Sequence, residues 1–217
     1  MTLAHLGVEA YRLHLLRGLE TQLALCGLER IAGVDEVGRG SLAGPVVAAA
    51  VVPAPGSVVP GVDDSKRLRP ERRRQIAERV RETAVAWAVT PVSPSAIDRI
   101  NILEATRRAM TRAVAALDPA PNAVLVDAVA LPDLEIPAFP VVRGDGLSYA
   151  VACASILAKE ARDRMMRELD RDYPQYGFAE HKGYGAARHL EALREYGPCP
   201  QHRLTFRSVL PSTGAPA

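Results

Sequence analysis

The strongest constraint on the fold is a pair of short apolar segments, Ile31–Val37 and Val46–Val52, separated only by the glycine-rich stretch 38–44. Each segment has the length and the β-branched content of a buried strand. The connection is too short for the helical crossover that parallel neighbours need, so the two strands must pair antiparallel. The sequence therefore predicts a sheet that contains at least one antiparallel pair.

The rest of the chain alternates strand-like runs with segments of helical periodicity. Further strands are expected at 84–90, 123–126 and 139–142, and helices at 8–26, 70–82, 95–117, 147–169 and 186–196. Strands interleaved with long helices are typical of an α/β fold in which helices cover a sheet. Combined with the antiparallel pair, this pattern predicts a mixed sheet.

Two of these helices have features that predict their ends. The apolar residues of helix 8–26 recur at helical spacing, and Gly27 fits its end. This apolar series consists of Val8, Tyr11, Leu15, Leu19 and Leu23. Ser95 is expected to cap the start of helix 95–117.

A chain of 217 residues is long enough for one substantial core, which predicts one main domain. We expect an N-terminal helical extension over 1–29 and the domain over 30–210, which includes a helical C-terminal segment. Residues 211–217 are rich in Pro, Gly, Ser, Thr and Ala and are expected to be a disordered tail.

The composition excludes several classes of protein. Hydrophobic residues make up 48% and charged residues 24%, as in ordinary globular proteins. The longest apolar run, 46–55, is interrupted by prolines and is too short to span a membrane, and the N-terminus lacks a signal-peptide pattern. Cys26, Cys153 and Cys199 show no paired spacing, which argues against a disulfide framework or a zinc site. We therefore expect a cytoplasmic protein that does not associate with membranes.

Basic residues crowd two segments, 67–81 and 162–188, although the formal net charge is only +2. Glutamates are interleaved with these arginines, which is typical of solvated helix faces. Most of these arginines are therefore expected at the surface, and charge alone does not establish a phosphate-binding face.

Four acids lie at the ends of apolar strands: Asp35, Glu36, Asp127 and Asp145. Burying an unpaired carboxylate is costly, so a group of such acids needs cations among them. Strand ends on one edge of a sheet converge, and oxygen ligands without Cys or His favour Mg²⁺ or Mn²⁺ over zinc. Taken singly, each acid fits a loop or capping role, but jointly they indicate a metal site.

The stretch Gly38-Arg39-Gly40 follows the first two acids directly. Successive side chains of a strand alternate faces, so Asp35 and Glu36 can both face one site only if the strand bends, and the glycines permit a bend. The glycines are compatible with a simple tight turn, and equally with a loop whose backbone approaches a nucleic acid closely. Spacing alone leaves both interpretations open.

These segments together resemble type 2 ribonuclease H (ribonuclease HII). The central match is Ala-Gly-Val-Asp-Glu-Val-Gly-Arg-Gly at 32–40, continued by Ser-Leu-Ala-Gly-Pro at 41–45. Further matching segments follow in the same order: Asp64-Ser65-Lys66, Val126-Asp127, Arg143-Gly144-Asp145, and the stretches 154–159, 181–185 and 197–203. The similarity covers about residues 30–208, and such an ordered set is more specific than any single motif.

The resemblance implies the ribonuclease H-like fold: a mixed five-stranded sheet flanked by helices, with a helical C-terminal appendage. It places the metal-binding catalytic acids on Asp35, Glu36, Asp127 and Asp145. It places the glycine-arginine-glycine motif, which grips the nucleotide around a ribose 2′-hydroxyl, on Gly38, Arg39 and Gly40, and the junction-sensing tyrosine on Tyr184. Ser65, Lys66 and Lys159 are expected to contact substrate, whereas His202 and Arg203 fit a structural role and substrate contact equally.

Four positions depart from the family pattern. Ser41 stands where proline is frequent, Ala128 where glycine is frequent, Ala186 where threonine is frequent, and Cys199 where serine is frequent. None of the four is an expected metal ligand. The departures therefore concern positioning and leave the implied reaction unchanged.

The implied activity is endonucleolytic hydrolysis of the RNA strand of RNA–DNA hybrids, and incision 5′ of single ribonucleotides in duplex DNA. The implied cofactor is Mg²⁺ or Mn²⁺, the products are 5′-phosphate and 3′-hydroxyl ends, and the partners are these nucleic acids; we expect a monomer. One alternative is a non-catalytic nucleic-acid-binding module, but a pure binder gains nothing from carboxylates that repel phosphate. Another is an enzyme of the same fold that cuts DNA, such as a junction nuclease or integrase. The expected ribose-recognition residues count against that alternative.

Overall fold

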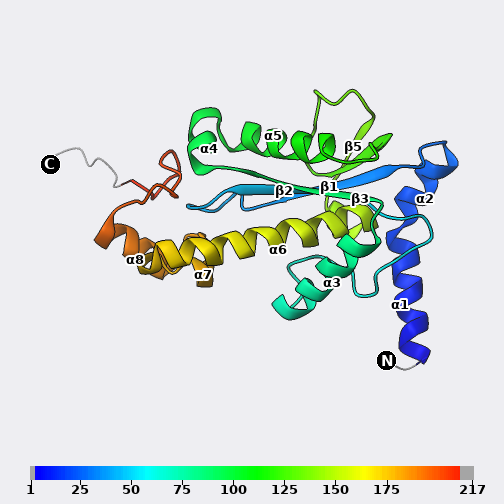
Figure 1. The fold of residues 1–217 in the computed structure, drawn as a ribbon, viewed down its shortest axis with the longest axis horizontal. Helices are drawn as coiled ribbons and strands as arrows, with labels where there is room; N and C mark the ends of the chain where they lie inside the picture. Colours follow the sequence, from blue (N-terminus) through cyan, green and yellow to red (C-terminus); the bar gives the residue numbers. More distant parts are fainter. Residues whose placement is uncertain (1–2, 211–217) are drawn as a thin grey trace.

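The computed structural model describes residues 3–210, which form a five-stranded sheet covered by helices on both faces (Figure 1). The strands are β1 (Ile31–Val37), β2 (Val46–Val52), β3 (Ala86–Val92), β4 (Ala123–Asp127) and β5 (Ala138–Val141). Their order in the sheet is β3-β2-β1-β4-β5. β1 and β2 pair antiparallel, as do β2 and β3, whereas β4 is parallel to both β1 and β5. The prediction of a mixed five-stranded sheet is confirmed.

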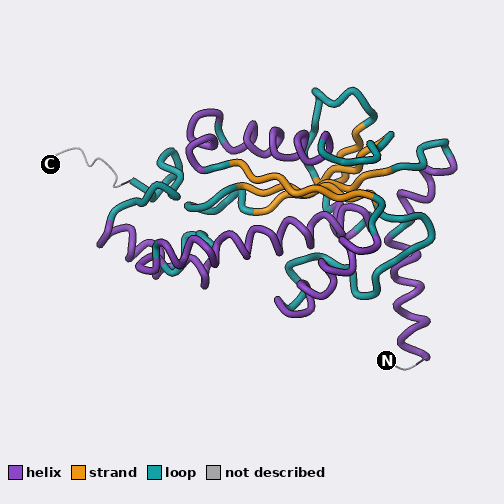
Figure 2. The backbone as a smooth tube through the Cα atoms, in the orientation of Figure 1, coloured by secondary structure: helices purple, strands orange, loops and turns teal. Residues whose placement is uncertain are grey.

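The helices come from every part of the described chain. They are α1 (Leu3–Leu16), α2 (Gly18–Leu25), α3 (Pro70–Thr83), α4 (Pro94–Ile100), α5 (Ile102–Ala115), α6 (Tyr149–Asp172), α7 (Phe178–His181) and α8 (Ala187–Tyr196). Two short 3₁₀ turns, η1 (Gly144–Gly146) and η2 (Pro174–Tyr176), flank α6. Figure 2 shows α6 as the longest helical segment, with the sheet alongside it. α1 and α8 lie at opposite ends of the molecule.

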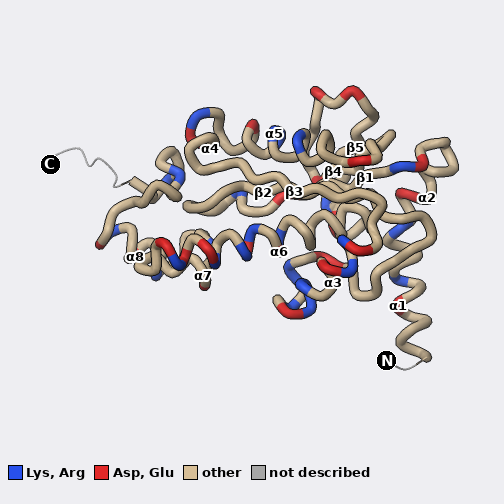
Figure 3. Tube along the Cα trace, in the orientation of Figure 1, with Lys and Arg blue, Asp and Glu red and all other residues tan. Residues whose placement is uncertain are grey.

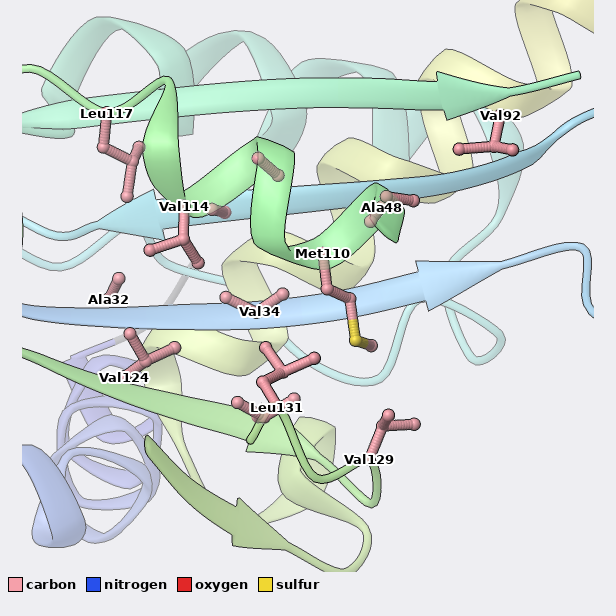
Figure 4. Close-up of a cluster of buried hydrophobic side chains, with 14 of the residues drawn as sticks. Ala32, Val34, Ala48, Val92, Met110, Val114, Leu117, Val124, Val129 and Leu131 are labelled. Carbon is pink, nitrogen blue, oxygen red and sulfur yellow. The ribbon is translucent and has the colours of Figure 1, made fainter. Parts of the chain in front are cut away.

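α5 packs on one face of the sheet, and α6 with α3 packs on the other. On the α5 side, Met110, Val114 and Leu117 cover strand residues such as Val34 and Ala48 (Figure 4). The apolar side chains of α5 lie three to four positions apart, so they form the single stripe that a sheet-covering helix needs. Both faces of the central strands are therefore buried, which explains why β2 is apolar throughout.

α6 crosses β1 at very short range because β1 contains Gly33. A Cβ atom at this position would lie 2.0 Å from the backbone carbonyl carbon of Ala150. No side chain fits there, so glycine allows the helix backbone to rest on the strand. This contact fixes the start of α6 beside the strand that carries Asp35 and Glu36.

The two strands predicted at 31–37 and 46–52 are confirmed with their bounds, but the helix predicted over 95–117 is wrong as a single element. Asn101 adopts φ 66°, which divides it into α4 and α5. The Asn101 side chain then caps α5 by accepting hydrogen bonds from the amides of Leu103 and Glu104. Ser93, not Ser95, caps α4, by accepting from Ala96 N.

The N-terminal helix predicted over 8–26 is also divided, into α1 and α2, around Arg17. Most of the predicted apolar series does not face the core, because Val8, Tyr11 and Leu15 are 71%, 66% and 58% exposed. Leu13 and Leu16 pack into the core instead. Leu23 is the member of the series that packs against buried core residues. The tail expected over 211–217 lies outside the described residues.

Charged residues of both signs alternate along α3 and α6 (Figure 3), as the sequence predicted for solvated helix faces. Arg73 and Arg162 are exceptions, since they are only 5% and 0% exposed. No helix within residues 3–210 combines the length and the apolar character required to cross a membrane.

Candidate active site

The four acids lie near the carboxyl edge of the three parallel strands. The β1–β4 register aligns Val34 with Val126, so the next residues, Asp35 and Asp127, leave neighbouring strands side by side. β5 runs parallel to β4, and Asp145 follows it in η1. Parallel strands end at the same edge of a sheet, which explains why these acids from distant parts of the sequence come together.

Asp35 and Glu36 reach this edge from opposite faces of β1. Their pairing partners on β2 are Ala49 and Ala48, and the register runs without a bulge as far as Val37. Ala49 packs on the α6 side and Ala48 on the α5 side, so the two acids alternate in the same way. The bend that the glycines permit is therefore absent from the paired residues Gly33–Val37.

The carboxylates interact electrostatically. Burial raises the pKa of Asp35 well above its usual value, and the carboxylates of Glu36 and Asp127 raise it further. Burial also raises the pKa of Glu36, where Asp127 adds to the effect and Arg39 opposes it. Burial, Asp64 and Asp127 raise the pKa of Asp145. A nearby cation would reverse this mutual destabilisation of the charged forms.

The chemical character of the donors fits a hard divalent ion. Glu36 Oε2 is buried without a hydrogen-bond partner, and such an orphaned carboxylate oxygen is well suited to bind a cation. Within residues 3–210, however, no three His, Cys, Asp or Glu side chains are grouped closely enough to ligate one ion. Asp35 Oδ1 instead accepts from Glu36 N, and Asp127 Oδ1 from Gly144 N, both at 2.7 Å. Binding one ion by three of these acids would require their side chains to move closer together.

The Gly38-Arg39-Gly40 loop borders this edge, and the surroundings of its two glycines differ. Gly38 adopts φ +91°, and a Cβ there would lie 2.1 Å from Arg162 Nε. Gly40 has no left-handed conformation, and a Cβ there would meet nothing within 4 Å. Protein packing therefore requires Gly38, whereas nothing within the described chain explains Gly40. Arg39 lies between them, with Nη1 3.4 Å from Glu36 Oε1.

Two fully buried arginines, Arg203 and Arg162, hold this loop and the segment that follows it, and the sequence did not single out Arg162. Arg203 donates to Arg39 O at 2.8 Å and to Gly44 O from both Nε and Nη2. Arg162 donates to the carbonyls of Ala43, Pro45 and Lys182. Arg203, for which the sequence left structure and substrate contact open, thus has a structural role. Neither arginine stands out from its neighbours by composition, so only their partners mark them.

Tyr184 lies on the adjoining loop and is 40% exposed. The guanidinium of Arg162 stacks over its ring, 5.6 Å from the centroid. Gly183 O accepts hydrogen bonds from Leu42 N and Ala43 N, which joins this loop to the segment that follows Gly40. The structure therefore brings Tyr184 and the glycine loop to the same surface.

The other predicted substrate contacts differ in exposure. The Lys66 side chain is 80% exposed, and Nζ lies 3.9 Å from Asp145 Oδ2. Ser65 is buried and accepts a hydrogen bond from Ser155 Oγ at 2.9 Å. Lys159 Nζ forms a 2.6 Å ion pair with Asp163. Lys66 is open to a ligand, whereas contact of substrate with Ser65 and Lys159 stays a prediction.

A model of the ribonuclease HII family matches residues 32–209, which is most of the chain. The chain belongs to the ribonuclease HII family. It is 52% identical to ribonuclease HII of Geobacillus kaustophilus over 88% of this chain and 73% of that protein. It is 51% identical to ribonuclease HII of Geobacter metallireducens over 84% and 86% of the two chains.

Solved structures agree with this assignment to the ribonuclease HII family. The crystal structure of the ribonuclease H2 from Pyrococcus horikoshii is similar to this chain with a TM-score of 0.71 and 26% identity. That similarity covers 83% of this chain and 95% of the Pyrococcus chain. As a ribonuclease HII family member, the chain is a divalent-metal-dependent endoribonuclease of the ribonuclease H class. The non-catalytic binding module and the DNA-cutting enzyme are thereby excluded.

Proposed function

We propose that the protein, acting as a monomer, cuts the RNA strand of RNA–DNA hybrids and also incises 5′ of a single ribonucleotide in duplex DNA. The products would carry 5′-phosphate and 3′-hydroxyl ends. The observation that carries this proposal is that four acids from three adjacent strands lie near one edge of the sheet and influence one another electrostatically, beside a glycine loop with open space at Gly40. One chain supplies all of these groups, so the proposed site needs no second subunit.

Asp35, Glu36, Asp127 and Asp145 would hold Mg²⁺ or Mn²⁺, since their donors are all oxygen. Bound divalent ions would supply an activated water and stabilise the negative charge on the departing 3′-oxygen. Gly144 N–H orients the Asp127 carboxylate, and α6 places Ser155 against Asp35. These contacts preorganise the carboxylates before substrate arrives.

The Gly38-Arg39-Gly40 loop would recognise ribose. Because a Cβ at Gly40 would meet no protein atom within 4 Å, the backbone there is accessible to a sugar. The 2′-hydroxyl distinguishes RNA from DNA and can both donate and accept a hydrogen bond. Arg203 Nη1 donates a 2.8 Å hydrogen bond to Arg39 O, which limits movement of the loop. Recognition through backbone groups also explains selection of ribose without selection of base sequence.

Tyr184 and Lys66 would position the strand around the cut. Half-exposed Tyr184 offers a ring that can pack against the deoxyribose that follows a lone ribonucleotide, where a 2′-hydroxyl would be too close. Lys66, next to Asp145, offers an ammonium group to a phosphate. Phosphate contacts of this kind supply much of the affinity for nucleic acids and weaken with salt.

The test uses an end-labelled DNA duplex with one ribonucleotide, incubated with the protein and Mg²⁺ or Mn²⁺. We expect a single incision 5′ of the ribonucleotide, no cleavage of the matched all-DNA duplex, and loss of cleavage after chelation. Tyr184→Ala should lower the rate of this incision roughly tenfold, because stacking on a nucleotide contributes about 1–3 kcal/mol. An intact single-ribonucleotide duplex, or cleavage of the all-DNA duplex, would overturn the proposal.

A further inference from the structure

A chain of histidines lies behind Tyr184 and ends on its backbone. His189 and His202 are 0% and 2% exposed. His202 Nδ1 lies 3.0 Å from Cys199 N, the two Nε2 atoms of His202 and His189 lie 3.0 Å apart, and His189 Nδ1 lies 2.8 Å from Tyr184 O. The contacts thus run without a gap from one backbone segment, through two imidazoles, to another.

The Tyr184 end of this chain fixes the direction of every hydrogen bond in it, and the shorter contact at the Cys199 end agrees. Cys199 presents both its N–H, at 3.0 Å, and its carbonyl oxygen, at 3.3 Å, to His202 Nδ1. When Nδ1 accepts from the closer N–H, His202 Nε2 carries the proton. His189 Nε2 must then accept, which leaves the proton of His189 on Nδ1. Tyr184 O can only accept, and it requires the same arrangement. The reversed chain would set a nitrogen lone pair against the Tyr184 carbonyl at 2.8 Å.

Aromatic packing prevents both rings from turning to other partners. His181 stacks on His189 with centroids 4.5 Å apart and an interplanar angle of 12°, and the Phe178 ring meets His189 edge-on at 5.5 Å. Tyr176 packs edge-on against His202 at 4.8 Å. The two imidazoles therefore keep their positions through packing as well as through hydrogen bonds.

Burial favours the neutral form of both rings, as the chain requires. Burial lowers the pKa of His202 to about 4, with His189 adding to the effect. Burial also lowers the pKa of His189, although the hydrogen bond to Tyr184 opposes this. Each ring therefore has one donor and one acceptor nitrogen near neutral pH.

We propose that His189 is a positioning residue for Tyr184: its Nδ1–H, selected by His202, holds the Tyr184 carbonyl and with it the ring that faces substrate. His181 assists, because its Nδ1 accepts from Gly183 N, the amide just before Tyr184. This role rests on the proposed function of Tyr184 as the residue that senses the junction. The histidines would thus contribute to the choice of substrate without contacting it.

The first test is independent of activity. Nitrogen NMR shifts of the wild-type protein near pH 7 report which ring nitrogen of each histidine is protonated. We expect the Nδ1–H form for His189 and the Nε2–H form for His202. The Nε2–H form for His189 would overturn the proposal even if every activity assay agreed with it.

The second test uses two amide variants of His189. In His189→Asn the side-chain amide lies near the position of Nδ1 and can still donate to Tyr184 O, whereas in His189→Gln it reaches toward the position of Nε2. Both remove the ring, so loss of packing is matched. The readout is the ratio of cleavage at a single ribonucleotide to cleavage of a long RNA–DNA hybrid. Misplacement of a recognition group by about 1 Å can cost up to about a hundredfold, so we expect His189→Gln to lower this ratio roughly tenfold.

His189→Asn should retain most of the wild-type ratio, and both variants should keep hybrid cleavage. Equal ratios in the two variants would overturn the positioning role and indicate that His189 only fills space. Tyr184→Ala, measured alongside, separates this failure from failure of the proposed function. If Tyr184→Ala leaves the ratio unchanged, the junction-sensing role of Tyr184 is wrong, while the NMR result still decides whether the histidine chain exists.

Discussion

Glu20 joins the N-terminal helices to the start of α6, close to Asp145, and its replacement tests that connection. The side chain is only 7% exposed. Its Oε1 atom accepts hydrogen bonds from Ser148 Oγ and from Ala150 N, both at 2.7 Å. Ser148 is itself the N-cap of α6 and accepts from Val151 N. A charge on α2 thus completes the capping of a helix far along the chain.

The expected loss has two parts. Removing a side chain that accepts from the first turn of a helix costs about 0.5–2 kcal/mol. Removing a negative charge from a partly buried helix N-terminus costs up to about 2 kcal/mol. The second oxygen, Oε2, is buried without a partner, and this offsets some of the loss. We therefore expect Glu20→Ala to lower the free energy of unfolding by about 2–3 kcal/mol, and Glu20→Gln, which keeps the acceptor, by about 1 kcal/mol.

Denaturant unfolding monitored by circular dichroism measures these differences, and the melting temperature of Glu20→Ala should fall by roughly 4–12 °C. Glu78→Ala is the control, because Glu78 is exposed on α3 and should change stability by less than about 0.5 kcal/mol. A loss below about 1 kcal/mol for Glu20→Ala, or equal losses for the Ala and Gln variants, would refute the reasoning.

Three further predictions follow from the site. Asp127→Asn should abolish cleavage while the melting temperature stays near that of the wild type; cleavage within a fewfold of wild type would refute its role. Ala128, where the family often has glycine, adopts φ 50°, so Ala128→Gly should raise the free energy of unfolding by about 1 kcal/mol, and a lower denaturation midpoint would contradict this. Burial and Glu36 raise the pKa of Asp35 above its usual value of 3.8. In protein treated with a chelator, protonation of Asp35 therefore stabilises the fold fully below pH 3.8, and this stabilisation is lost as the pH rises through the raised pKa. The melting temperature of Asp35→Asn relative to wild type should therefore increase from acid toward neutral pH, and a constant difference would exclude this linkage.

The sequence determined the centre of the sheet and the location of the chemistry. β1 and β2 could be predicted with their bounds because a short apolar run is a local property, and their antiparallel pairing followed from the short connection. The acids could be placed at one edge because each lies near or just beyond the carboxyl end of an apolar strand. Their separate roles, and those of Gly40 and Tyr184, came from the family resemblance and not from spacing.

Only the tertiary structure decided which charged and polar groups are internal. Arg162 and Arg203 lie in polar surroundings of the sequence, yet both are fully buried because carbonyls from segments distant in the chain accept all their hydrogen bonds. The histidine chain behind Tyr184 likewise joins residues that no periodicity relates. The division of helix 95–117 depended on Asn101 adopting a left-handed conformation. Burial of a polar group is stable only when its partners are in place, and those partners are set by the packing of the whole chain, so a local pattern does not contain them.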